Sequence, residues 1–237
     1  TSYASRPMMG LGVSLAFIIL AGLIAFYLFG NTGNTVVVVI AAGLGAYMAL
    51  NIGANDVANN MGPAVGANAL TMGGAIAIAA IFESAGALLA GGDVVSTIAK
   101  GIVAPESMHT AAVFIWAMLA ALFSAALWVN LATWIGAPVS TTHSVVGGVM
   151  GAGIAAAGFA AVNWPTMYKI AASWVISPVL GGAVAALFLW FIKSRIVYQD
   201  NKIAAARRCV PYLSCFIGGA SSVYSSPKRS EEHISEL

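Results

Sequence analysis

The sequence predicts an all-α membrane protein: a polytopic transmembrane helix bundle with one broken helix and one re-entrant helical hairpin. Three observations lead to this fold class. The chain is 60% hydrophobic and 8% charged, and its mean hydropathy of +0.90 is far above that of a soluble domain. Several apolar runs reach the roughly 20 residues that cross a bilayer. Two stretches, 53–68 and 136–144, interrupt the apolar sequence with polar residues.

Three apolar runs in the first part of the chain predict three spans. Met8–Phe29 predicts an uncleaved helix, because no small-residue cleavage site follows it. Thr35–Ile52 and Thr71–Ala90 predict the next two, and Glu83 lies well inside the latter. A carboxylate at that depth costs about 2.5–3.5 kcal/mol unless it is neutralised or paired, so we expect Glu83 to face the bundle interior. The alternative is a protonated carboxyl that only hydrogen-bonds a neighbouring helix.

The stretch 53–68, Gly-Ala-Asn-Asp-Val-Ala-Asn-Asn-Met-Gly-Pro-Ala-Val-Gly-Ala-Asn, predicts a break in the second span. Gly62 and Pro63 weaken a helix, and we expect Asp56 to cap a short following helix that reaches Leu70. Exposed backbone at membrane depth is tolerated only where protein covers it or where it lines a wet cavity. This stretch is therefore a candidate ligand site.

The second half of the chain predicts two further spans, Thr110–Trp134 and Trp164–Ile192, with Pro178 as a kink in the latter. The segment Asp93–His109 is polar enough to predict a surface connection with a short amphipathic helix.

The stretch 136–144, Gly-Ala-Pro-Val-Ser-Thr-Thr-His-Ser, carries four hydroxyls and an imidazole. The Gly- and Ala-rich run Val145–Phe159 that follows is nearly too short to cross, which predicts a re-entrant hairpin over 136–159. Pro138 suits a helix start and Ser140 an N-cap, which would direct free backbone N–H groups into the protein. The alternative is ordinary capping, with the hydroxyls bonded to backbone carbonyls.

The apolar runs and the charge pattern divide the chain into an N-terminal extra transmembrane helix (1–35), a region that holds both polar stretches (36–192) and a basic tail (193–237). The excess of Lys and Arg in the tail predicts a cytoplasmic location for it and a plasma (inner) membrane protein. Within it, Ile196–Arg208 predicts a surface amphipathic helix and 221–237 a disordered end. The two cysteines are expected to be free thiols. The net charge of +2 gives no reason to expect a nucleic-acid partner.

The polar residues suit an oxyanion bound through neutral donors, since no Arg or Lys lies at depth beside them. Asp56 would repel a bare anion, so a cation or a proton must accompany the ligand, as in a cation-coupled anion symporter. Na⁺ prefers oxygen ligands, which amides, hydroxyls and carboxylates supply. A proton carried by Glu83 or Asp56 would serve as well, so both coupling ions remain open. No cofactor is expected.

Three segments resemble the signatures of the PiT family of inorganic phosphate transporters: 53–71, 81–86 (Ile-Phe-Glu-Ser-Ala-Gly) and 137–144. The resemblance implies symport of inorganic phosphate with Na⁺ or H⁺ through two inverted repeats, usually assembled as a dimer. It implies substrate-binding residues, coupling-ion residues and a Na⁺ position without any other metal. The substrate-binding residues are Asn55, Asp56, Ser140, Thr141 and Thr142, the coupling-ion residues are Asp56, Asn59 and Glu83, and Na⁺ would lie at Asn55, Asp56 and Asn59.

The sequence departs from that family in carrying one copy of each motif where the family has two. We therefore expect one repeat of a transporter, either a truncated product or a half that pairs with a second repeat or in a homodimer. The alternatives are a non-transporting membrane subunit or remnant, and a carrier of another oxyanion such as sulfate. An intramembrane enzyme using Glu83, His143 and Ser144 is disfavoured, because no nucleophile or metal-ligand spacing supports it; the protein is not expected to be an enzyme.

Overall fold

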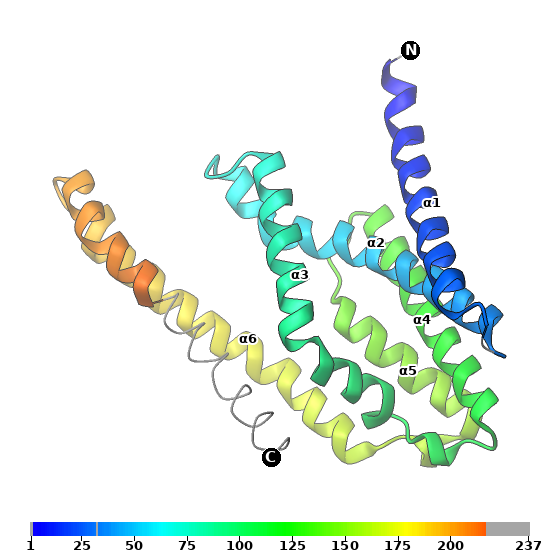
Figure 1. Ribbon diagram of the computed structural model, residues 1–237. Coiled ribbons are helices and arrows are strands. Elements are labelled where there is room, and N and C mark those ends of the chain that lie inside the picture. Colours follow the sequence, from blue (N-terminus) through cyan, green and yellow to red (C-terminus); the bar gives the residue numbers. More distant parts are fainter. Residues whose placement is uncertain (1, 32, 217–237) are drawn as a thin grey trace, which may run out of the picture. The chain divides into compact units, whose positions relative to one another are not determined.

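The computed structural model describes residues 2–31 and 33–216, and over this part of the chain it contains no β-strand (Figure 1). Within the described residues, five helices are long and apolar enough to cross a membrane, which confirms the predicted all-α multi-span class. They are α1 (Ser2–Phe29), α2 (Thr35–Gly66), α3 (Met72–Ser96), α4 (Ala111–Trp134) and α6 (Trp164–Ile192). The remaining long helix, α5 (Thr141–Ala157), has 17 residues. At 1.5 Å per residue it is about 25 Å long, shorter than the roughly 30 Å of a bilayer core.

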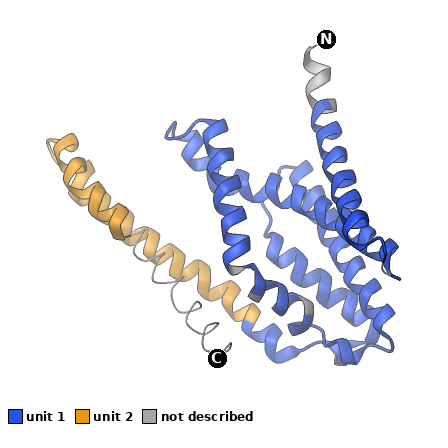
Figure 2. Cartoon of the chain, in the orientation of Figure 1, with its two compact units in different colours: residues 1–169 blue, residues 170–237 orange. Residues whose placement is uncertain are grey.

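The chain forms two compact units, residues 1–169 and 170–237, which we describe separately (Figure 2). The first holds α1 to α5 and the first turn of α6. The second holds the rest of α6, a π-helical turn (Lys193–Val197) and a helix over 202–216. The amphipathic helix predicted over Ile196–Arg208 therefore starts later, because the side chain of Asn201 accepts a hydrogen bond from the Ala204 N–H and caps it there. The predicted disordered end, 221–237, lies outside the described residues.

The predicted break in the second span is wrong, because α2 is one continuous helix of 32 residues through the whole Asn- and Asp-rich stretch. Pro63 lies in its last turn, so the single intrahelical N–H bond that it removes is near the end of the helix and not in the middle of the span. The helix ends only after Gly66, where Asn68 has φ 55° and the N–H groups of Asn68 and Ala69 return to the carbonyls of Val65 and Ala64. This Schellman arrangement satisfies the last carbonyls and turns the chain towards α3.

Over 136–159, where a re-entrant hairpin is predicted, the structure has one long helix, α5, which forms a hairpin with α4, and local hydrogen bonds cap the facing ends of the two helices. Gly136, at φ 73°, ends α4, and the N–H groups of Gly136 and Ala137 bond the carbonyls of Thr133 and Ala132. Ser140 starts α5 as its N-cap, accepting a hydrogen bond from the His143 N–H at 3.2 Å, as predicted. Pro138 precedes the helix instead of starting it.

The core of the first unit lies where α4 meets α2 and α5. Met48 of α2 packs on the small residues Ala125 and Ala126 and on Val129, all buried. One turn earlier on α4, α5 approaches closely at Gly148, where a Cβ atom would lie 2.7 Å from the Ala121 carbonyl oxygen. Small residues at such a contact allow two backbones to come together in a membrane protein.

The charged residues described between α3 and α4 are exposed, as predicted for a surface connection, but two apolar residues of this segment are fully buried. Ile102 and Val103 are 0% and 1% exposed. Val103 forms an isolated bridge with Val162, and the Ile102 carbonyl accepts a hydrogen bond from the Asn163 N–H at 2.8 Å. The segment is therefore held against the chain that follows α5. Two of its apolar residues are buried although charged residues flank them in the sequence.

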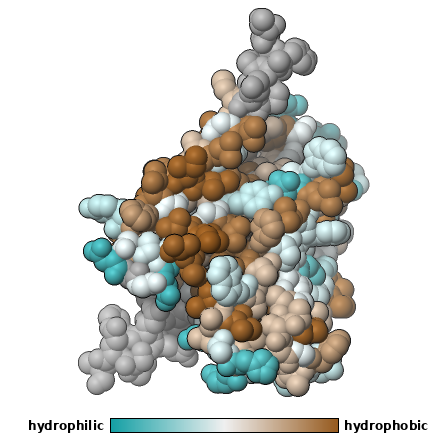
Figure 3. Space-filling model, turned by 90° about the vertical axis from the view of Figure 1, so that its right-hand side faces the viewer, coloured by the Kyte–Doolittle hydropathy of each residue, from teal (hydrophilic) through white to brown (hydrophobic). Residues whose placement is uncertain are grey.

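Much of the outer surface is apolar. Large hydrophobic side chains such as Leu23 (59%), Leu88 (88%) and Trp116 (54%) are exposed on α1, α3 and α4. The face in Figure 3 shows brown apolar residues over a wide area. Soluble monomers rarely expose such large contiguous apolar patches, whereas a bilayer covers them.

The close contact at Gly148 predicts that Gly148→Ala lowers the free energy of unfolding by about 1–2 kcal/mol. Strain of about 1–3 kcal/mol against a backbone carbonyl outweighs a gain in helix propensity of up to about 1 kcal/mol. Gly147→Ala is the matched control, since a Cβ there meets no atom within 4 Å. Denaturant titration in detergent, followed by circular dichroism, measures both; equal stability of the two variants would contradict the packing.

Candidate functional site

Three asparagines of α2 lie on one face of the helix, Asn51, Asn55 and Asn59, and the first two contact α4. Asn51 and Asn55 are 5% and 6% exposed. Residues four apart lie above one another on a helix, so these three amides form a ladder along α2. An amide without a partner in such a place would cost about 1–3 kcal/mol.

Two hydrogen bonds connect this ladder to α4. The Asn130 amide donates to Asn51 Oδ1 at 2.9 Å, while Asn51 donates to the Tyr47 carbonyl at 2.8 Å. One turn further along, Asn55 Nδ2 donates to Thr133 Oγ1 at 3.1 Å. Both buried amides are therefore satisfied, and α2 is held in a single register on α4.

The hydrogen bonds around Asn55 all run in one direction. Thr133 donates its hydroxyl proton to the Val129 carbonyl at 2.8 Å, and Asn59 Nδ2 donates to Asn55 Oδ1 at 3.1 Å. Every donor in this chain points back towards α4. The orientation of the Asn55 amide is fixed as a result, and Asn59, which is exposed, stands at the open end of the chain.

The two polar motifs meet where the Thr141 hydroxyl donates to Asp56 Oδ2 at 2.8 Å. Thr141 is 7% exposed and is the first residue of α5, and Asp56 is half-buried on α2. A carboxylate is favoured beside a helix N-terminus, where backbone N–H groups are not used within the helix. A hydrogen bond to a charged acceptor is also about twice as strong as a neutral one. The contact therefore ties the start of α5 to the middle of α2.

The other hydroxyls of the α5 motif lie around this contact. Ser140 and Thr142 are exposed, and Ser144 donates to the Ser140 carbonyl at 2.9 Å. Part of the hydroxyl cluster thus caps the helix, as the alternative interpretation of the sequence expected. The hydroxyl groups of Ser140 and Thr142 remain accessible beside the first turn of α5.

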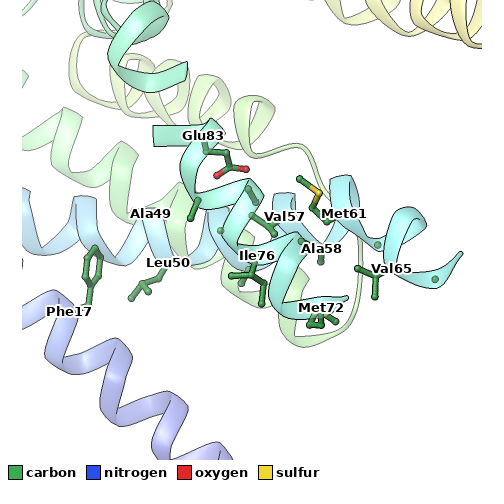
Figure 4. A pocket seen from close by; sticks show the side chains of 17 residues that line it. Phe17, Ala49, Leu50, Val57, Ala58, Met61, Val65, Met72, Ile76 and Glu83 are labelled. Atoms are coloured by element: carbon green, nitrogen blue, oxygen red, sulfur yellow. The ribbon is translucent and has the colours of Figure 1, made fainter. Parts of the chain in front are cut away.

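Glu83 is not brought to the Asp56–Thr141 pair. It lines a groove of about 890 Å³ between α1, α2 and α3, together with 16 other residues that are mostly small or apolar (Figure 4). The α2 residues of this groove, such as Val57 and Met61, belong to a different face from Asn55 and Asn59. The predicted site residues therefore fall into two places, one on each side of α2.

Three residues of the polar cluster were not predicted from the sequence: Asn51, Asn130 and Thr133. The signal for Asn51 was its position four residues before Asn55, which continues the ladder by one turn. Asn130 and Thr133 are isolated polar residues in a long apolar run, and such residues carry no spacing that identifies a partner.

The donor set around Asp56 fits Na⁺ better than a transition metal. Among the described residues no group of three His, Cys, Asp or Glu side chains could hold a metal ion. A carboxylate, amide oxygens and hydroxyls are hard ligands, which suit cations of the main groups. Asp56, Asn59 and Thr141 offer one of each.

Spanning helices around a satisfied polar cluster define the class of this molecule: a multi-span membrane protein with polar side chains inside its bundle, an arrangement typical of transporters. The particular family follows from comparison with known proteins. Residues 52–235 match the phosphate transporter family, and the chain belongs to this family. The resemblance noted in the sequence is thereby confirmed.

Three relatives illustrate the match. A Helicobacter pylori J99 protein named as a phosphate permease is 54% identical over 220 residues, which are 92% of this chain and 41% of that protein. A similarly named Chlamydia muridarum protein is 44% identical over 73% of this chain and 41% of its own length. A solved structure, described as the sodium-dependent phosphate transporter, has a TM-score of 0.64 and 39% identity, covering 81% of this chain and 42% of that one. The chain spans about two fifths of the length of these relatives.

The contact between α2 and α5 predicts that Thr141→Val lowers the free energy of unfolding by about 1–2 kcal/mol, because the half-buried Asp56 loses a charge-assisted hydrogen bond. Thr142→Val, one residue further along and exposed, is the matched control and should change stability by less than about 0.5 kcal/mol. Thermal unfolding in detergent measures both variants. A Thr141→Val protein as stable as the control would show that the bond does not hold the helices together.

Proposed function

We propose that this chain forms one half of a phosphate transporter, in which inorganic phosphate crosses the membrane together with Na⁺. The observation that carries the proposal is the Asp56–Thr141 hydrogen bond, which joins two polar motifs 85 residues apart. Membership of the family and the names of the relatives support phosphate as the anion. Similarity to a solved transporter that is described as sodium-dependent supports Na⁺ over a proton as the coupling ion.

Phosphate binds, in this proposal, at the start of α5. The exposed Ser140 and Thr142 hydroxyls and the backbone N–H groups of Thr141 and Thr142 are neutral donors, and the positive end of the helix favours an anion. Thr141 lies between the anion and Asp56, and its hydroxyl is bonded to the Asp56 carboxylate. Asn55 already uses both ends of its amide, so its part is to orient Asn59.

Na⁺ binds between the phosphate and Asp56. Two unit charges of like sign 4 Å apart repel by about 4 kcal/mol at an effective dielectric constant of 20. A cation held by Asp56, Asn59 and Thr141 reverses this repulsion, so each ion raises the affinity for the other. Phosphate binding that strengthens with Na⁺ concentration is the direct consequence.

Glu83 supplies a second carboxylate for cation coupling, separate from Asp56. Among the 17 residues that line its groove it is the one ionisable group. A charge in such an apolar place is costly without a partner, so it binds a cation or a proton.

Transport by alternating access needs an opposing half around the same site. Since the chain spans about two fifths of its relatives, we assign the second half to a further repeat or to a second copy of the chain.

The test is uptake of labelled phosphate into liposomes, with and without an inward Na⁺ gradient. We expect uptake to require the gradient and to resist excess sulfate. Asp56→Asn and Thr141→Ala should each abolish it, since each removes a ligand of the Na⁺ position. Asn60→Ala, an exposed position on the same helix, is the control and should retain uptake.

The measurement is made on this chain and on its 54%-identical Helicobacter relative with the matching substitutions. If the relative transports phosphate and this chain does not, the chain needs a partner that supplies the second half. Flux that ignores the Na⁺ gradient, or that survives Asp56→Asn, contradicts the proposed coupling.

A further inference from the structure

A cluster of basic residues follows the apolar run of α6. Half of the chain's ten Lys and Arg residues lie within 193–208, against one acidic residue, Asp200. These basic residues are Lys193, Arg195, Lys202, Arg207 and Arg208, and all five side chains are exposed.

The structure folds this segment into a hairpin on the end of α6. The rings of Phe188 in α6 and Phe216 in the helix 202–216 lie 6.0 Å apart, and Figure 1 shows the two helices running beside each other. The partly buried residues of the second helix share one face, at spacings of one, four and eight residues: Ala205, Ala206, Cys209 and Leu213. Arg207 and Arg208 lie on the opposite, outer face.

The hairpin places four basic residues at similar heights along its long axis. Counting from the Phe188–Phe216 contact at 1.5 Å per residue, Lys193 and Arg195 lie about 8 and 11 Å towards the turn, and Arg208 and Arg207 about 12 and 14 Å. The four charges occupy a band roughly 6 Å deep, close to the thickness of one headgroup layer of a bilayer. We call Lys193, Arg195, Arg207 and Arg208 the cationic band.

Among the residues that the structure describes, the cationic band has no anionic partner. None of its four side chains forms a salt bridge or hydrogen bond with another described residue, and Asp200, at the turn, is also unpaired. Exposed apolar side chains border it on the same hairpin, including Val210 (49%) and Phe216 (64%). Long basic side chains beside exposed apolar ones are typical of the boundary between acyl chains and headgroups.

We propose that the cationic band binds the phosphate groups of anionic phospholipids, and that this lipid contact anchors the end of α6 at the membrane surface. The band begins directly after the last apolar residue of a spanning helix, so lipid headgroups are the anions that meet it.

The test titrates the full chain in detergent micelles with dansyl-labelled phosphatidylglycerol or phosphatidylcholine and follows energy transfer from tryptophan; Trp190, which is exposed, lies in the last turns of α6. We expect tighter binding of phosphatidylglycerol, weakened by salt because the charges are exposed. Arg207→Gln with Arg208→Gln should weaken it by up to about thirtyfold and leave phosphatidylcholine binding unchanged. Lys193→Gln with Arg195→Gln, on the other limb, should act in the same way.

The matched control is Lys100→Gln with Lys169→Gln, which removes the same charge from exposed positions elsewhere in the chain. Far-UV circular dichroism checks that every variant keeps its helices. Equal affinity of the unaltered chain for the two lipids overturns the proposal, as does an equal loss in the control. Displacement of phosphatidylglycerol by millimolar inorganic phosphate also overturns it, because it would identify a site for small anions.

Discussion

The hydrogen bond between the Thr141 hydroxyl and the Asp56 carboxylate is the contact on which the polar interior of the bundle depends. A carboxylate among apolar helices is costly unless hydrogen bonds or charges compensate it. Here the first residue of α5 supplies the donor and the helix end supplies a favourable dipole. A shift of α5 by one residue would remove both, so the position of α5 on α2 is fixed by the need to satisfy one charge.

Helix α4 makes that position attainable. Its small residues let α2 pack at Ala125 and Ala126 and let α5 approach at Ala121, so one helix sets the spacing of the other two. The hydrogen bonds of Asn51 with Asn130 and of Asn55 with Thr133 then select the register of α2. Such interhelical hydrogen bonds are worth only about 0.6–2 kcal/mol each in a membrane. Packing therefore supplies most of the stability of the bundle, and the polar contacts decide which packing is adopted.

The sequence predicted what local chemistry and hydropathy determine. The spans, the Ser140 cap and the two polar motifs follow from residue types and spacing, and the structure has them. The break in α2 was predicted because polar residues, Gly62 and Pro63 interrupt the apolar run, and it is absent because Asn51 and Asn55 find partners on α4 about 80 residues away. Val103 was expected at the surface because charged residues flank it, whereas its bridge to Val162 buries it. Both errors have one cause: long-range pairing leaves no mark in local sequence.

The separation of the two carboxylates constrains how ions can be coupled in the proposed function. Asp56 bonds α5, whereas Glu83 lines a groove between α1, α2 and α3 that contains none of the other predicted site residues. A helix with its side chains is about 10 Å across, and cation–oxygen bonds to hard ligands are about 2.0–2.6 Å long. One cation therefore cannot be shared by both groups across α2 in this conformation. Coupling through both carboxylates requires either two cation positions or a movement of α3 past α2. A movement of α3 past α2 would disrupt few packing contacts, because the groove between those helices is open and is lined mostly by small residues.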